Sequence, residues 1–290
     1  MRTCFLVAIL AGLLTAGCTA PTTRMGPFMM RNYVWVGKRM ERVKTPYVID
    51  ARHGRKHVLL IGCNHTRDTA SPQFVVIQQQ FRKLQPQVAF NEGGQLDPAE
   101  QYATVQEGIS RNGETGVMKY LCDRTGIQLL NGDLAEHVEF PLMLHKYGKD
   151  DLLLYYVMER LVVPYLGGAY GSQSFESLYE KAIPDWFVKS GLPLSANEQT
   201  LGYFKALYQT KIGRPFTLTL SEDIEKFDYV NGNGCYYCAL GRTSKMTRDS
   251  VLLAKIDQAL DKHDRVMVTF GHGHALAIEP ALRQVVRRRR

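Results

Sequence analysis

The sequence reads His57-Val58-Leu59-Leu60-Ile61-Gly62-Cys63-Asn64-His65 near its start and Arg265-Val266-Met267-Val268-Thr269-Phe270-Gly271-His272-Gly273-His274 near its end. In both stretches a short apolar run leads directly into the pattern Gly-x-x-His. Such runs are typical of strands that are covered on both faces of a largely parallel sheet. Because ligands of these sheets gather outside the carboxyl ends of the strands, we expect His65 and His274 to share one site.

The segments between the two motifs alternate between helix and strand patterns. The helices are predicted after Ser71-Pro72, at 116–125 and at 248–261, and the short strands at 88–90 and 126–130. Residues 139–215 have mostly helical patterns. The sequence therefore predicts an α/β fold with a central, mostly parallel or mixed sheet flanked by helices, and a helical insertion between the third strand and the last.

The amino terminus resembles a bacterial lipoprotein signal. Arg2 precedes an apolar run at 5–14, and Leu14-Thr15-Ala16-Gly17-Cys18 has the small residues of a cleavage site. The resemblance implies cleavage before Cys18 and acylation of its thiol. The protein would then be anchored by lipid in the cell envelope, on the periplasmic side of the outer membrane in a Gram-negative cell. A plain signal peptide with an incidental cysteine is the alternative.

This signal sets the predicted domain organisation. Residues 1–17 form the signal peptide, and 18–45 a tether that leads into a first strand or hairpin near Tyr33 to Tyr47. Residues 46–286 form one domain that contains the helical insertion, and 287–290 a basic tail. The longest later apolar stretch, 152–166, is interrupted by charged residues, so we expect no membrane span there.

The formal net charge of +8 overstates the basic character of the folded body. Five of the arginines lie in the leader, at Arg2, or in the tail at 287–290, and about +3 remains without them. This balance argues against a nucleic-acid-binding protein. The tail is expected to be a solvated end, or else a contact for anionic lipid or cell-surface polymer.

Polar residues follow each predicted strand and form the candidate site. His65 follows the first strand, Glu92 the second, Asp133 the third and His274 the last. Two histidines with carboxylates suit a divalent metal that activates water, and without metal Glu92 or a histidine can act as general base. Glu92 and Asp133 are alternatively ordinary turn residues, and His272 is either a further ligand or part of a turn.

An ordered set of motifs resembles the Tiki/TraB superfamily, which includes erythromycin esterase-like and ChaN-like proteins. The set comprises Gly62-x-x-His65, Glu92 in Asn-Glu-Gly, Arg248-Asp249 at the head of a helix, and Gly271-x-x-His274. In outline the resemblance covers residues 55–290. Members have been assigned as metal-dependent proteases, metal-independent esterases and haem-binding lipoproteins.

The resemblance implies a role for each matching residue. His65, Glu92 and His274 would bind a divalent metal such as Mn, Co or Zn, or activate water. Arg248 would orient a carboxylate or stabilise an oxyanion, and Asp133 would be a further acidic position.

Two functions therefore compete. The first is a metal-dependent hydrolase of the cell envelope that cleaves a peptide or ester bond in a peptide or small-molecule substrate. The second is a non-catalytic lipoprotein that binds haem or iron, with axial ligands among the histidines or the tyrosines at 155, 156, 236 and 237. An envelope scaffold without activity is a third possibility.

The pair Cys235-Tyr236-Tyr237-Cys238 follows a glycine-rich loop, and a local disulfide is its leading interpretation. A zinc site would need more ligands than this pair supplies. A thioredoxin-like role is not favoured, because the pair is expected in a loop and not at the head of a helix. Two packed thiols are the remaining alternative.

Overall fold

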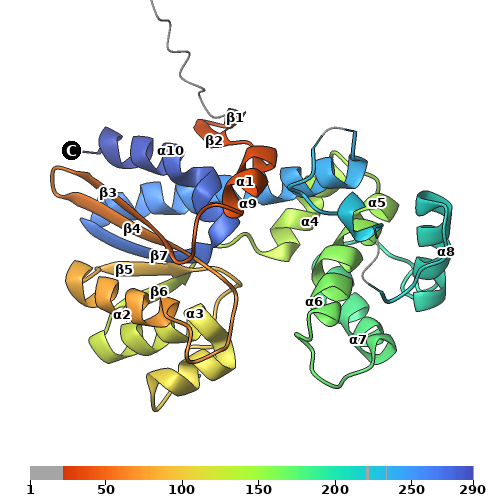
Figure 1. The fold of residues 1–290 in the computed structure, drawn as a ribbon, viewed down its shortest axis with the longest axis horizontal. Helices are drawn as coiled ribbons and strands as arrows, with labels where there is room; N and C mark the ends of the chain where they lie inside the picture. Colours follow the sequence, from red (N-terminus) through yellow and green to blue (C-terminus); the bar gives the residue numbers. More distant parts are fainter. Residues whose placement is uncertain (1–21, 220–221, 233, 290) are drawn as a thin grey trace, which may run out of the picture.

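A five-stranded mixed sheet lies at the centre of the larger lobe (Figure 1). The computed structural model describes residues 22–219, 222–232 and 234–289. The strand order is β3-β4-β7-β5-β6, and every neighbouring pair is parallel except β3 with β4. The strands are β3 (Tyr47–His53), β4 (Lys56–Cys63), β5 (Val88–Asn91), β6 (Gln128–Asn131) and β7 (Arg265–Gly271). The predicted α/β class is confirmed.

Helices cover both faces of this sheet (Figure 1). Along β4, Leu59 and Ile61 belong to one buried cluster with residues of α2 and α3, whereas Val58 and Leu60 belong to another with residues of α9 and α10. The bounds are α2 (Gln73–Leu84), α3 (Val105–Thr125), α9 (Tyr236–Lys262) and α10 (His272–Arg288). Burial on both faces explains why these strands are apolar without alternation.

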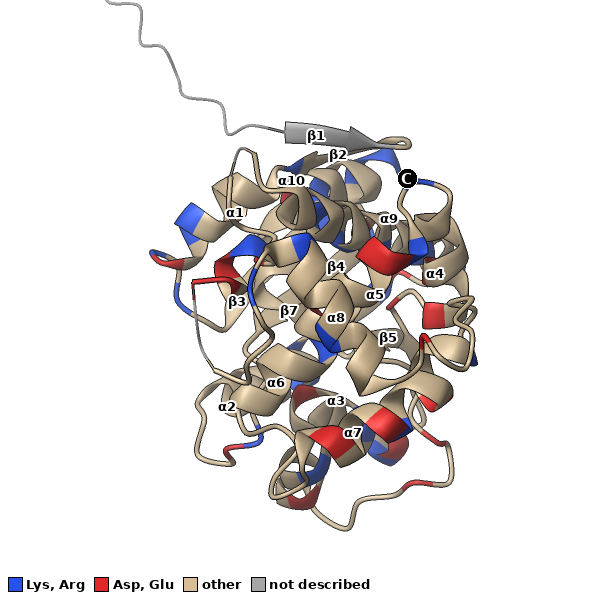
Figure 2. Ribbon diagram, turned by 90° about the vertical axis from the view of Figure 1, so that its right-hand side faces the viewer, with Lys and Arg blue, Asp and Glu red and all other residues tan. Residues whose placement is uncertain are grey.

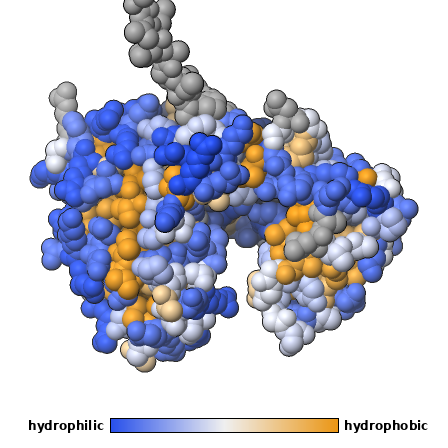
Figure 3. Space-filling model, in the orientation of Figure 1, coloured by the Kyte–Doolittle hydropathy of each residue, from blue (hydrophilic) through white to orange (hydrophobic). Residues whose placement is uncertain are grey.

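The predicted insertion forms a separate helical lobe with its own apolar core. Its elements are α4 (Glu136–Leu144), α5 (Lys149–Val157), the π-helix η1 (Met158–Val162), α6 (Val163–Leu166), α7 (Phe175–Ala182), the π-helix η2 (Ile183–Val188), α8 (Leu201–Ile212) and the short η3 (Ile224–Lys226). The space-filling view shows an open notch between the helical lobe and the sheet lobe (Figure 3). None of the described helices has the length and apolar content that a membrane crossing requires.

The segment predicted as a tether is largely part of the fold. The strands β1 (Thr22–Met25) and β2 (Phe28–Arg31) form a hairpin, and α1 (Tyr33–Met40) follows. The expectation of a strand or hairpin at Tyr33 to Tyr47 is wrong, because Asn32 caps a helix by accepting a hydrogen bond from the amide of Val34. Tyr33 and Val36 are buried in the sheet core. The predicted signal peptide and Cys18 lie outside the described residues.

Three further boundaries differ from the prediction. The helix expected at 248–261 begins at Tyr236, and α3 begins at Val105 and bends at Asn112–Gly113. The described part of the tail is exposed to solvent at Arg287 and Arg288, as predicted, and these two residues complete α10. Arg289 pairs with Asp257 and Asp261 of α9. Figure 2 shows basic and acidic residues interspersed on the side that it displays.

Gly62 allows α10 to pack closely against β4. A Cβ at this position would lie 2.7 Å from the Cβ of Ala275 and 3.3 Å from the Cα of His272. The first glycine of the Gly-x-x-His pair therefore has a packing role.

We predict that Gly62→Ala lowers the free energy of unfolding by about 1–3 kcal/mol, because α10 must move away from the sheet. Gly202→Ala is the matched control, since the nearest atom to its added Cβ lies 3.9 Å away. Urea unfolding of both variants measures the effect. Equal stability of the two variants would contradict this role of Gly62.

Candidate functional site

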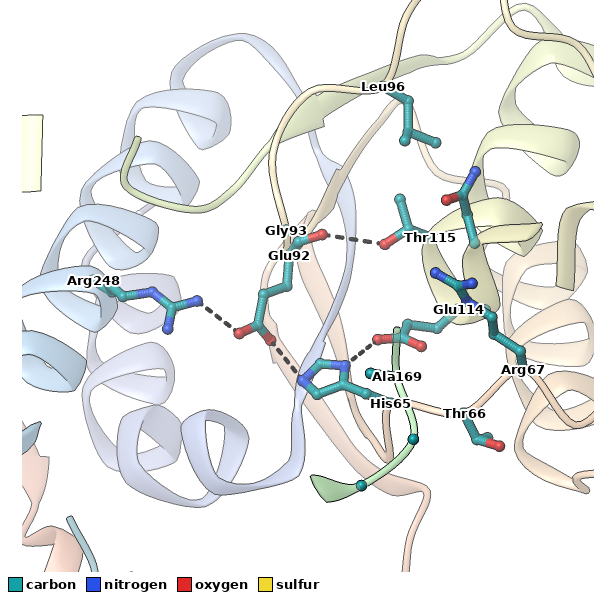
Figure 4. A pocket seen from close by; sticks show the side chains of 14 residues that line it. His65, Thr66, Arg67, Glu92, Gly93, Leu96, Glu114, Thr115, Ala169 and Arg248 are labelled. Carbon is teal, nitrogen blue, oxygen red and sulfur yellow. Dashed lines mark hydrogen bonds and ion pairs between the residues drawn. The ribbon is translucent and has the colours of Figure 1, made fainter. Parts of the chain in front are cut away.

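The structure brings the predicted site residues together at the carboxyl edge of the sheet. His65 and Glu92 follow β4 and β5, Asp133 follows β6, and His274 lies in the first turn of α10 after β7. The two Gly-x-x-His motifs lie side by side because β4 and β7 are parallel neighbours whose ends are level: Cys63 of β4 lies opposite Gly271 of β7. Glu92 occupies the centre, with Arg248 on one side and His65 on the other (Figure 4).

Each carboxylate oxygen of Glu92 already accepts a hydrogen bond. Nη2 of Arg248 donates to Oε1 at 2.8 Å, and the amide of Gly271 donates to Oε2 at 2.5 Å. Nε2 of His274 lies 3.6 Å from Oε1, and Nε2 of His65 lies 3.7 Å from Oε2. Burial raises the pKa of Glu92, but the charges of His274, Arg248 and His65 outweigh it and lower the pKa from its usual value. Glu92 is therefore a buried, ionised carboxylate.

Both histidines are oriented through their Nδ1 atoms. Nδ1 of His65 lies 2.5 Å from Oε1 of Glu114, and Nδ1 of His274 lies 2.5 Å from Oδ1 of Asp249. An ionised carboxylate only accepts, so each Nδ1–H donates and each Nε2 is directed at Glu92. The hydroxyl of Tyr33 donates to Asp249 at 2.7 Å and lies 2.9 Å from Nδ1 of His274. The hydrogen bond to Glu114 is the largest cause that raises the pKa of His65 to about 9, and the negative charges of Glu92 and Glu114 add to it.

Arg248 joins two acidic side chains from neighbouring strand ends. Its Nε and Nη2 donate to Oδ1 and Oδ2 of Asp133 at 2.7 and 2.5 Å, in addition to the bond to Glu92. Burial raises the pKa of Asp133, but Arg248 brings it well below its usual range. Asp133 also accepts a bond from the amide of Leu134, so it is a turn residue as well as a site residue.

A cavity of about 690 Å³ opens onto this cluster. Its wall includes His65, Glu92 and Arg248, residues 112–115 of α3, and Gly167 to Ala169 from the helical lobe. The side chain of His65 is 62% exposed, whereas that of His274 is 8% exposed. A molecule bound in the cavity would therefore touch His65. His274 is buried and contacts Glu92 from within the protein.

The sequence reasoning missed Glu114, Asp249 and Tyr33. Asp249 stands beside Arg248 in the quoted motif, which is a signal that could have revealed it. Glu114 follows a bend in α3, and Tyr33 lies in the presumed tether; no sequence pattern marks either of them. His272 is not a further member of the cluster, since its ring lies beside that of Tyr47 and its Nε2 has no partner among the described residues.

The donor types fit a divalent metal, but their arrangement does not form a full ligand set. Two imidazole nitrogens and a carboxylate suit Mn, Co or Zn. Among the described residues, however, no group of three or more His, Cys, Asp or Glu side chains is placed to hold a metal ion. Arg248 and Gly271 already bind the oxygens that such an ion would need. A metal at this site stays a prediction.

The tyrosines considered for haem lie away from the pocket. Tyr155 and Tyr156 are fully buried in the helical core, and the hydroxyls of Tyr236 and Tyr237 both donate to Asp151. The structure pairs Cys235 with Cys238 in a disulfide.

Comparisons with protein-family models, curated proteins and solved structures find no match for this chain. The resemblance to the Tiki/TraB superfamily therefore stays a prediction from the ordered motifs.

A partly buried ion network ties α9, which carries Arg248, to the helical lobe. Nζ of Lys245 lies 2.7 Å from Oε1 of Glu159 in η1, next to Arg160. Burial raises the pKa of Glu159, but Lys245 and Arg160 outweigh it and lower the pKa from 4.5 to about 2. Because the folded-state pKa is the lower one, this group stabilises the fold above a pH of about 4.5, and the contribution is lost as the pH falls toward 2.

We predict that Glu159→Gln lowers the free energy of unfolding by about 2–3 kcal/mol at neutral pH, because the buried Lys245 loses its charged partner. The difference from the unaltered protein should shrink as the pH approaches 2. Urea unfolding across this range measures it, with the exposed Glu176→Gln as control. A difference that does not change with pH would contradict the ion pair.

Proposed function

We propose that this chain is a hydrolase that cleaves an ester or amide bond, with Glu92 and His65 as its acid–base pair. The observation that carries this proposal is the separation of 3.7 Å between Oε2 of Glu92 and Nε2 of His65, in the wall of a cavity. Each group is fixed by its own partners, as a prepositioned catalytic pair requires.

The environments of the two groups suit opposite roles. Glu92 is held in its ionised form and can take a proton from a water molecule that attacks a carbonyl carbon. His65, held at Nδ1 by Glu114, can give its Nε2 proton to the leaving group. Arg248 lines the same cavity and supplies positive charge for the oxyanion. The apo separation exceeds a hydrogen bond, which is common before substrate binds.

A second form of the proposal includes a metal. Both Nε2 atoms face Glu92, and both Nδ1 atoms bind carboxylates, as the outer partners of metal-ligating histidines commonly do. His65, His274 and Glu92 would then hold the ion, which when bound lowers the pKa of water and makes it nucleophilic near neutral pH.

The setting of the enzyme is also part of the proposal. The lipoprotein-like leader supports a lipid anchor at Cys18 and a place in the cell envelope. The notch between the lobes supports a peptide or small-molecule substrate that reaches the cavity from solvent. No observation on the described residues favours the haem-binding alternative.

We expect Glu92→Gln and His65→Ala each to lower kcat/KM by about 100-fold or more, since each removes one member of the acid–base pair. The measurement is hydrolysis of a panel of esters and peptides by the full chain. The exposed residues Glu176→Gln and His137→Ala are the matched controls, and circular dichroism checks that all four variants fold. Full activity of Glu92→Gln would overturn the proposal.

Removal of divalent metals by a chelator distinguishes the metal-free form of the proposed hydrolase from the metal-dependent form. We expect activity to survive removal of divalent metals, because the oxygens of Glu92 already have donors. Loss of activity that Mn, Co or Zn restores, together with a lower metal content of the His65→Ala and His274→Ala variants, would assign the metal form.

A further inference from the structure

Cys235 and Cys238 lie at the amino end of a long helix, a position that the sequence did not indicate. Cys235 is the cap of α9, and its Sγ accepts a hydrogen bond from the amide of Cys238 at 3.2 Å. The sequence pattern places the pair in a loop, which does not favour exchange with thiols. In the structure the pair instead lies at the start of α9, where the helix dipole stabilises a cysteine thiolate.

The two sulfurs differ in access. Cys235 is partly exposed, whereas Cys238 is fully buried. Of the two residues, Cys235 is therefore the one that an incoming thiolate can approach from solvent. This asymmetry gives the pair one attacked sulfur and one leaving sulfur.

The disulfide contributes little to the stability of the fold. Only two residues separate the cysteines, and closing so short a loop removes little entropy from the unfolded chain. These two residues are held independently of the sulfurs, because the hydroxyls of Tyr236 and Tyr237 donate to Asp151 at 3.0 and 3.1 Å. The ring of Tyr237 also stacks on Phe227. The first turn of α9 has anchors that do not need the sulfur–sulfur bond.

The two thiols of the reduced pair would also have hydrogen-bond partners. Sγ of Cys238 lies 3.4 and 3.5 Å from the carbonyl oxygens of Lys226 and Glu225, which can accept from a thiol. Sγ of Cys235 faces the amide of Cys238, which can donate to a thiolate. Sγ of Cys235 also lies 2.9 Å from the carbonyl oxygen of Lys226, so each sulfur has a nearby acceptor for its thiol form.

We propose that Cys235–Cys238 is a thiol–disulfide exchange site for small thiols or for a dithiol on another protein. A thiol gives up its proton and attacks Sγ of Cys235 as a thiolate, the bond to Cys238 breaks, and Cys238 leaves with the electron pair and takes up that proton. A second thiolate attacks the mixed disulfide, releases Cys235 as a thiolate and forms the oxidised partner. The external thiols supply both electrons, and the reverse sequence oxidises a dithiol. This proposal does not depend on the hydrolase proposal.

The test compares two single-cysteine variants of the full chain. Cys238→Ser leaves the accessible Cys235, and Cys235→Ser leaves the buried Cys238. With glutathione disulfide as the probe, we expect Cys238→Ser to form the mixed disulfide about tenfold faster or more, because only its thiol combines access with a helix start. Peptide mass mapping assigns the modified cysteine and separates it from the other cysteines of the chain.

The unaltered protein supplies a measurement that does not depend on the variants folding. We expect millimolar reduced glutathione to reduce the pair while circular dichroism remains that of the folded protein. Equal rates for the two variants, or a pair that is reduced only in denaturant, would overturn the proposal.

Discussion

The structure depends on one guanidinium that neutralises two buried carboxylates. Arg248 of α9 binds Asp133 through two nitrogens and Glu92 through one of them, and so joins the ends of β6 and β5. Without this cation, the buried negative charges of Glu92 and Asp133 would lack a positive partner between them. The same helix reaches the helical lobe through Lys245 and Glu159. Arg248 therefore fixes Glu92 at the junction of the sheet edge and the cavity.

The two Gly-x-x-His motifs lie at the same carboxyl edge of the sheet, but their glycines have different roles. Gly62 lets α10 approach β4, because a Cβ there would meet Ala275. Gly271 keeps the space beside Glu92 open, since its Cβ would lie 3.0 Å from Oε2 of Glu92 and 3.1 Å from Nε2 of His65. Parallel pairing of β4 and β7 then sets the histidines on either side of Glu92.

The sequence predicted the part of the site that depends on strand ends. Apolar runs fix where the strands stop, so the positions of His65, Glu92 and His274 follow from topology. The partners of the histidines could not be predicted in this way. Tyr33 reaches the site only because α1 packs on the sheet core, and Glu114 only because α3 bends. The first half of α9 was missed because its buried face includes the polar Ser244 and Lys245, which hide helical periodicity.

The central claim is that Arg248 and Glu92 interact directly and hold each other in place. The most direct test is a double-mutant cycle on the free energy of unfolding, with Arg248→Met, Glu92→Gln and the combined variant, each measured by urea unfolding at neutral pH. We expect Arg248→Met to cost about 3–5 kcal/mol in the unaltered protein, and about 1–3 kcal/mol less when Glu92 is already glutamine. Costs that agree within about 0.5 kcal/mol in the two backgrounds would contradict the account.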